Sequence, residues 1–184
     1  MTRVISGVAG GRRLQTPAGP RTRPTSDRVR EALFSRLEHL DVVDEARVLD
    51  LYAGSGALGI EAASRGARHV TLVDSARDAA DACRRNVASL GLTDRVTVAA
   101  EKAVTFVQRP ATWDLVLVDP PYDVTEADLA AVLAPLQLSA HGVLVVERGR
   151  RSAEPSWPDG ITLLDRRAYG DTVMWFAETS VEPA

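Results

Sequence analysis

The segment VLDLYAGSGALGIEAASRG, residues 48–66, constrains the fold most, because it joins an apolar strand directly to a helix. Residues 48–51 predict a short buried strand, and residues 57–65 are rich in helix-forming side chains. Between them, Gly54 and Gly56 allow a tight turn and a close approach of the backbone to a ligand. The unpaired N–H groups at the start of the helix face the same ligand. The segment therefore predicts a small-molecule site at the end of the strand.

Composition limits the class of protein. The chain has 184 residues with 45% hydrophobic side chains, which suits one α/β domain with a small extension. No apolar run reaches the roughly 18–20 residues of a membrane span, and the N-terminus lacks the apolar stretch of a signal peptide. The single cysteine, Cys83, excludes an internal disulfide and a cysteine-cluster metal site. We therefore expect a cytoplasmic monomer with no metal, no membrane contact and no obligate protein partner.

The net charge of −3 conceals an uneven distribution. Residues 1–30 hold seven arginines and one acidic residue, Asp27, so a basic arm precedes an acidic body. This favours contact with a polyanion, although a solvated arginine-rich face is the alternative. The candidate RNA-binding residues are Arg3, Arg12, Arg13, Arg21 and Arg23.

Strand and helix patterns alternate after residue 46, which predicts a parallel sheet with helices on both faces. The predicted strands are 47–51, 69–73, 96–99, 113–118 and 142–147, and the helices between them are 57–65, 76–90, 103–108 and 125–136. Residues 161–167 and 172–177 predict a final antiparallel pair. Before the sheet, residues 2–15 predict a small β-hairpin and residues 28–40 a helix with Thr25, Ser26 or Asp27 as its N-cap. Residues 1–40 are thus expected to form an extension, and residues 41–184 the main domain.

The glycine pattern alone leaves two cofactors open. Residues 54–59 satisfy G-x-G-x-x-G, and Asp74 follows Gly54 by 20 residues, as in dinucleotide-binding folds. In either case a carboxylate after the second strand can accept hydrogen bonds from the ribose hydroxyls. Asp50, four residues before Gly54, favours S-adenosylmethionine, because it would repel a pyrophosphate but attract a sulfonium. The alternative for Asp50 is a carboxylate that ties down its own glycine loop.

Asp119-Pro120-Pro121-Tyr122, after the fourth predicted strand, favours the same cofactor. The two prolines fix the backbone, so the Asp119 side chain and the Pro120 carbonyl can both accept from one amino group. Tyr122 offers a flat face on which a base can stack. The alternative is a proline-rich turn with a packing tyrosine.

With these motifs the chain resembles the S-adenosylmethionine-dependent methyltransferases that modify exocyclic amines through an (Asp/Asn)-Pro-Pro-(Tyr/Phe) motif. Five segments extend the resemblance over nearly the whole chain to the RsmD family, the 16S ribosomal RNA (guanine-N2)-methyltransferases. They are RVISGVAGGRRLQTP, RPTSDRVREALF, VLDLYAGSGALGIEAASRGA, VDPPY and YGDT. The first two are the specific part, because DPPY also occurs in DNA adenine and protein glutamine methyltransferases. The resemblance implies a class I methyltransferase fold with a seven-stranded, mostly parallel sheet, an N-terminal extension that holds RNA, and a guanine presented in the small ribosomal subunit.

The resemblance also implies roles for individual residues. The catalytic residues would be Asp119, Pro120, Pro121 and Tyr122. Contacts with S-adenosylmethionine would come from Asp50, Tyr52, Ala53, Gly54, Ser55, Gly56, Asp74, Glu101, Lys102 and Asp119. The chain departs from the pattern at Lys102, where an acidic or amide side chain would bind the adenine, so Glu101 or backbone atoms would take that role. Thr25 and Arg30 would either reach the pocket or act as a helix cap and a surface salt bridge.

Three other functions fit part of the pattern. A DNA adenine-N6 methyltransferase shares DPPY, but the chain has no separate target-recognition domain. A non-catalytic RNA-binding protein could retain the fold, but both cofactor motifs are intact. A nicotinamide oxidoreductase shares the glycine loop, but nothing in the chain resembles its catalytic residues.

Overall fold

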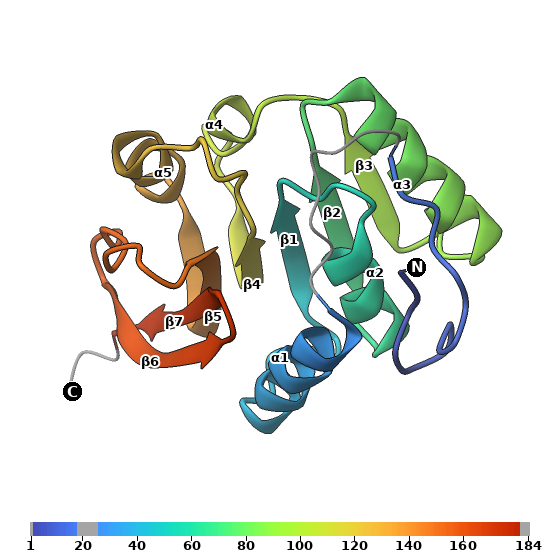
Figure 1. Cartoon of the computed structure of the whole chain (residues 1–184), viewed down its shortest axis with the longest axis horizontal. Coiled ribbons are helices and arrows are strands. Elements are labelled where there is room, and N and C mark those ends of the chain that lie inside the picture. The colour runs from blue at the N-terminus through green and yellow to red at the C-terminus, as the bar shows by residue number, and fades with distance from the viewer. Residues whose placement is uncertain (1, 18–25, 181–184) are drawn as a thin grey trace.

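A computed structural model describes residues 2–17 and 26–180, and within them the chain forms a seven-stranded sheet in the order β3-β2-β1-β4-β5-β7-β6 (Figure 1). The strands are β1 (Arg47–Leu51), β2 (His69–Val73), β3 (Val96–Ala99), β4 (Thr112–Val118), β5 (Gln137–Gly149), β6 (Ile161–Tyr169) and β7 (Thr172–Thr179). The helices are α1 (Asp27–His39), α2 (Ala57–Ser64), α3 (Arg77–Ser89), α4 (Ala103–Phe106) and α5 (Glu126–Leu133).

The first five strands are parallel, and β7 lies antiparallel between β5 and β6. This confirms the predicted fold class, including the antiparallel final pair. The order reverses between β1 and β4, because the chain builds outward from β1 to β3 and then returns to the other side of β1. Ligands of such sheets bind at the carboxyl ends of the strands beside this reversal.

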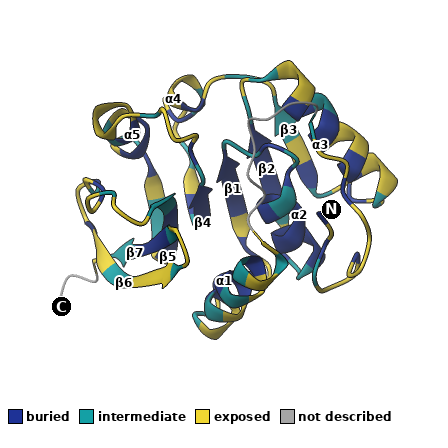
Figure 2. Cartoon of the chain, in the orientation of Figure 1, coloured by how far each residue is buried: buried dark blue, intermediate teal, exposed yellow. Residues whose placement is uncertain are grey.

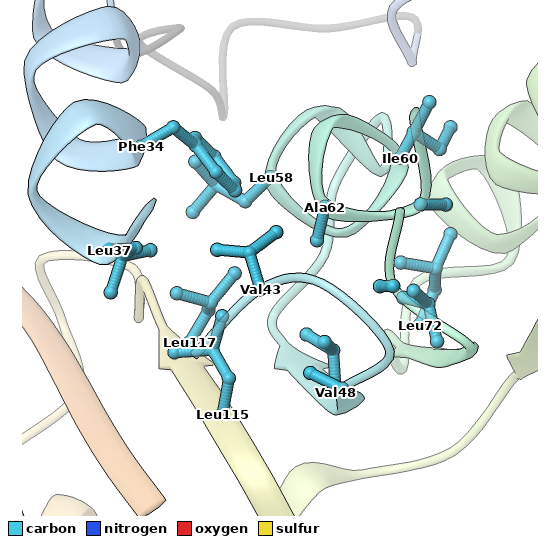
Figure 3. Packing of buried hydrophobic residues seen from close by; sticks show 14 of the residues in the cluster. Phe34, Leu37, Val43, Val48, Leu58, Ile60, Ala62, Leu72, Leu115 and Leu117 are labelled. Carbon is cyan, nitrogen blue, oxygen red and sulfur yellow. The ribbon is translucent and has the colours of Figure 1, made fainter. Parts of the chain in front are cut away.

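The sheet divides the core into two apolar layers. Side chains alternate across a strand, so Val48 packs in the layer with α1, α2 and α3, whereas Leu49 packs in the layer with α4 and α5. Figure 3 shows the first layer, in which Phe34 of α1 lies by Leu58 of α2, and Leu37 of α1 lies near Leu117 of β4. The central strands β1 and β4 are buried along most of their length (Figure 2). The apolar strand patterns of the sequence therefore reflect burial on both faces.

Residues 2–17, which we call the N-terminal arm, differ from the predicted β-hairpin. Only one isolated antiparallel bridge forms, between Arg3 and Arg13. The backbone N–H groups of Ile5 and Ser6 donate instead to the Glu61 carboxylate of α2, at 2.7 and 3.0 Å. The arm does turn back on itself as predicted, because the Val4 N–H donates to the Arg12 carbonyl and the Leu14 N–H to the Thr2 carbonyl, at 2.8 and 2.9 Å. The prediction of two regular strands was wrong, because the next donors bind a helix side chain and not a neighbouring strand.

The N-terminal arm shares the core of the main domain. Val4, Ala9 and Leu14 are buried in the same apolar layer as α1, α2 and α3. A division of the chain at residue 40 stays a prediction.

Ser26 is the N-cap of α1 and accepts from the Val29 N–H, while the alternative cap Thr25 lies outside the described residues.

Among the described residues, no helix combines the length and apolar character needed to cross a membrane.

Candidate active site

A cavity of about 1080 Å³ lies at the carboxyl ends of β1, β4 and β5, where the sheet order reverses. It extends from the N-terminus of α1, past the glycine loop, to the turn between β6 and β7. Ten of the predicted site residues line it: Asp50, Tyr52, Ala53, Gly54, Ser55, Asp74, Asp119, Pro120, Pro121 and Tyr122. Three do not: Gly56, Glu101 and Lys102.

Asp74 and the glycine loop form one side of the cavity. The two Asp74 carboxylate oxygens accept from the N–H groups of Gly54 and Ala76, at 2.8 and 2.9 Å. Gly54 has a φ of 58°, a left-handed conformation that favours glycine. The carboxylate therefore holds the loop open toward the cavity, and each oxygen keeps a second lone pair for a ligand.

Gly56 serves packing more than ligand contact. It is the N-cap of α2 with a φ of 80°, and a Cβ there would lie 2.9 Å from Leu72 Cδ1 and 3.0 Å from Ile60 Cδ1. Glycine lets α2 approach the sheet at this point. A contact between Gly56 and a cofactor stays a prediction.

Asp50 ties down the start of α2. Only 1% of the residue is exposed, and its Oδ2 accepts from the Gly59 N–H at 2.8 Å. Burial raises the Asp50 pKa to about 7, and the nearby Asp74 charge adds to the rise. The structure thus shows the role in which Asp50 ties down its own glycine loop. A ligand-facing role stays a prediction, supported by the position of Asp50 in the cavity wall.

The raised Asp50 pKa predicts that Asp50→Asn becomes relatively more stable as the pH rises. Below pH 3.8, the pKa of Asp50 in the unfolded chain, both the folded and the unfolded protein hold the Asp50 proton. Between pH 3.8 and about 7 only the folded protein keeps it, so the free energy of unfolding falls as the pH rises. The asparagine oxygen can still accept from Gly59 without that cost. Urea unfolding should show that, between pH 4 and pH 8, the free energy of unfolding of the variant rises by up to about 4 kcal/mol relative to that of the wild type. A constant difference would contradict the raised pKa.

Asp119 directly follows β4, Glu147 lies in β5 just beyond its last pairing with β4, and both line the cavity. Val118 pairs with Val146 in the register of β4 and β5, so the two acids occupy corresponding positions one residue later. Burial raises the Asp119 pKa well above its usual value, and the Glu147 and Asp50 charges raise it further. A carboxylate with a raised pKa in a cavity is a candidate proton acceptor.

The raised Asp119 pKa predicts an acid limb in the pH dependence of turnover. Only the ionised carboxylate accepts a hydrogen bond from an amine, so kcat/KM should fall as the pH drops through the raised pKa. Glu147→Gln removes the neighbouring negative charge and should move this limb to lower pH. Methyl transfer measured between pH 5 and 9 for both proteins tests the shift. An unmoved limb would show that Glu147 does not influence the ionising group.

Tyr122 is 74% exposed at the mouth of the cavity. An aromatic ring in this position is free to stack on an incoming base. The Pro121 carbonyl accepts from the Val124 N–H at 3.1 Å, which closes the turn after the motif. Arg148 holds the same turn through the Val124 carbonyl and the Glu126 carboxylate, at 2.9 and 2.7 Å.

Several residues that line the cavity belong to no motif with an assigned role. Among them are Glu147 and Arg148 near the carboxyl end of β5, Tyr169 to Thr172 at the turn between β6 and β7, and Arg28 and Val29 at the start of α1. Glu147 had a usable signal, because it stands directly after an apolar run, just as Asp74 and Asp119 do. The YGDT segment, residues 169–172, contributed to the family resemblance, but no other sequence pattern assigned a function to it.

The predicted adenine contacts lie elsewhere. Both Glu101 oxygens accept from Arg109, at 2.6 and 2.9 Å, and Lys102 is an exposed residue at the N-cap of α4. Neither side chain lines the cavity, so a role in adenine binding gains no support from their positions.

The predicted RNA-binding arginines have different surroundings. Arg13 is exposed, Arg12 donates to the Ser89 carbonyl at 2.8 Å, and Arg3 donates to Asp27 at 2.9 Å. Arg21 and Arg23 lie outside the described residues. Arg30 lines the cavity, which agrees with the first of its two predicted roles. It also pairs with Asp27, but the predicted surface position of that salt bridge is wrong, because Arg30 is only 1% exposed.

Comparison with known proteins assigns the chain to a family. A family model described as conserved hypothetical protein 95 matches residues 2–178. Ribosomal RNA small subunit methyltransferase D of Haemophilus influenzae is 30% identical over 173 residues, which cover 91% of this chain and 89% of that protein. The chain belongs to the RsmD family.

Further comparisons agree with this assignment. The Escherichia coli (strain K12) protein of the same name is 40% identical over 120 residues, 65% of this chain and 60% of that protein. The solved structure of yhhF from Escherichia coli has a TM-score of 0.84 and 29% identity, and covers 98% of this chain and 99% of that chain. This RsmD-family chain is therefore a methyltransferase with the class I fold, and its family and fold imply the use of S-adenosylmethionine.

Proposed function

We propose that this enzyme transfers a methyl group from S-adenosylmethionine to the exocyclic N2 of one guanine in small-subunit (16S) ribosomal RNA. The substrate would be an assembled or partly assembled small subunit, and the enzyme a cytoplasmic monomer. The observation that carries the proposal is the Asp119 carboxylate in the same cavity as the glycine loop and Asp74. The names of the Haemophilus influenzae and Escherichia coli relatives support ribosomal RNA as the substrate class.

The cavity fits this cofactor better than a dinucleotide. Among the described residues, seven acidic side chains line it against three arginines, so acidic groups are in excess. The acids are Asp50, Asp74, Asp78, Asp119, Asp123, Glu147 and Asp171, and the arginines are Arg28, Arg30 and Arg148. This excess would repel a pyrophosphate but suit a sulfonium and an ammonium. Its volume lies slightly above the roughly 300–1,000 Å³ typical of ligand pockets, which leaves room for a base beside the cofactor. Asp74 would accept from the ribose hydroxyls through its remaining lone pairs.

When bound, S-adenosylmethionine supplies an electrophilic methyl group. The exocyclic nitrogen of guanine is a weak nucleophile because its lone pair is delocalised into the ring. Asp119 and the Pro120 carbonyl would accept its two N–H groups and pull the nitrogen toward tetrahedral geometry, which localises the lone pair on the nitrogen. The nitrogen must lose one proton when it takes the methyl group, and the Asp119 carboxylate would accept that proton. Tyr122 would stack on the guanine, swung out of its neighbours into the cavity.

The N-terminal arm would bind the phosphate backbone. Arg12 and Arg13 are exposed cations, and phosphate contacts position RNA without specifying its sequence. Replacing both by alanine should weaken RNA binding and reduce the slope of log K against log [salt] by about 1.4 for two lost contacts. Filter binding across a salt series measures the slope, with Arg109→Ala as the control because Arg109 pairs with Glu101 outside the cavity. Equal slopes for all three proteins would rule out the arm as an RNA contact.

The substrate class is tested by methyl transfer from radiolabelled S-adenosylmethionine. Naked ribosomal RNA, small subunits that lack the modification and duplex DNA would be offered separately to the enzyme. The proposal expects label in the RNA of the small subunit and none in DNA. Label in DNA alone would favour the adenine-N6 alternative, and no transfer with intact cofactor binding would favour the non-catalytic one.

A further inference from the structure

We propose that Glu147 is a specificity-determining residue, which accepts the N1–H of the guanine while Asp119 accepts an N–H of its N2. The inference rests on the proposed function and deepens it, because it states how the site would distinguish guanine from other bases that carry an exocyclic amine.

The register of β4 and β5 places the two acids side by side. Val118 pairs with Val146 in a parallel ladder, so Asp119 and Glu147 follow at the same level of two adjacent strands. Adjacent strands lie about 4.8 Å apart, which is within reach of two carboxylates and one base edge. Both residues line the same cavity.

The two side chains also share a face of the sheet. Val118 and Val146 both pack in the apolar layer with α4 and α5. Because side chains alternate along a strand, Asp119 and Glu147 are directed to the opposite face, toward α1 and α2. The negative charge of Glu147 raises the pKa of Asp119, which agrees with two carboxylates directed into the same cavity.

Arg148, which follows Glu147 in β5, holds the turn beside the two acids. It donates to the Val124 carbonyl and to Glu126, at 2.9 and 2.7 Å. Its guanidinium therefore stabilises the turn after the Asp-Pro-Pro-Tyr motif.

Guanine matches a pair of acceptors better than adenine or cytosine does. Its Watson–Crick edge carries the N1–H and the N2 amino group on adjacent atoms, so two carboxylates can each accept. Adenine and cytosine place a ring nitrogen acceptor next to their exocyclic amine, and this acceptor would face Glu147 without a proton between them. A matched pair of hydrogen bonds discriminates between bases by about 5- to 150-fold.

The test uses small subunits reconstituted with an RNA that carries 2,6-diaminopurine at the methylated position, once that guanine has been mapped. This base keeps the 2-amino group but replaces the N1–H donor with an acceptor. Wild-type enzyme should methylate the guanine RNA with a kcat/KM about 5- to 150-fold higher than that for the analogue RNA. For Glu147→Gln the ratio should fall at least fivefold, because the glutamine amide can donate to the analogue. Glu147→Asp keeps an acceptor and should still prefer guanine.

Glu154→Gln is the matched control, because Glu154 is an exposed acid that pairs with Trp157 and does not line the cavity. It should keep the wild-type ratio. Equal rates of wild-type enzyme on the two RNAs, or a wild-type ratio in Glu147→Gln, would overturn the inference. The wild-type comparison needs no variant, so it decides the matter even if Glu147→Gln does not fold. Failure of the proposed function would look different, since the wild type would then leave the guanine RNA unmethylated.

Discussion

Replacing Asp119 by alanine should abolish methyl transfer while the affinity for S-adenosylmethionine stays within a few fold of the wild type. The variant removes the only side-chain acceptor that the proposal assigns to the N2 amine, and the loss should exceed about 100-fold in kcat. The glycine loop and Asp74, which would hold the cofactor, bond to each other and not to Asp119. Folding should be unaffected or improved, because burial disfavours the Asp119 charge in the folded protein.

Two measurements separate these effects. Calorimetry with S-adenosylmethionine reports cofactor binding, and single-turnover transfer to small subunits reports the chemical step. Asp159→Ala is the matched control, because Asp159 is an exposed acid outside the cavity, and it should keep wild-type turnover. Loss of cofactor binding in Asp119→Ala would mean that Asp119 serves the cofactor instead of the amine.

Replacing Glu61 by alanine should lower the free energy of unfolding by about 3–5 kcal/mol. Glu61 is fully buried and accepts from the N–H groups of Ile5 and Ser6 and from Arg65 Nε, the last at 2.7 Å. Its removal would leave two backbone donors unsatisfied and the Arg65 charge without its closest partner. Urea unfolding would measure the loss.

Glu38→Ala supplies the matched comparison. Glu38 also pairs with Arg65, at 3.1 Å, but its side chain is 49% exposed, so its removal should cost about 0–1 kcal/mol. Hydrogen exchange adds a local readout, because the amides of Ile5 and Ser6 should exchange faster only in Glu61→Ala. Equal stability of the two variants would show that burial of the carboxylate does not anchor the N-terminal arm.

The sheet and most of the cavity could be predicted from local patterns. Five apolar strands bounded by helices imply parallel pairing, and the carboxyl ends of parallel strands lie along one edge. That rule alone placed Asp50, Asp74 and Asp119 together. The same rule applies to Glu147, which lies near the carboxyl end of β5, but no motif marked it as a site residue.

The errors arise where a side chain or backbone group has a partner that no sequence pattern indicates. The backbone of Ile5 bonds to Glu61, 56 residues away, and no local pattern in residues 2–15 indicates that partner. Arg30 resembles a surface helix residue in sequence, yet it is buried and donates to the Arg3 carbonyl and to Asp27. Glu101 follows a strand like the other acids, but Arg109 binds its carboxylate outside the cavity.

The central claim is that the cavity presents a guanine amine to a methyl donor, and the modified nucleoside tests it most directly. Small subunits lacking the modification would be incubated with the enzyme and labelled S-adenosylmethionine, and their RNA digested to nucleosides and separated by chromatography. The account predicts that the label co-migrates with N2-methylguanosine and is absent with Asp119→Ala. Label on N6-methyladenosine, or on any nucleoside other than N2-methylguanosine, would contradict it.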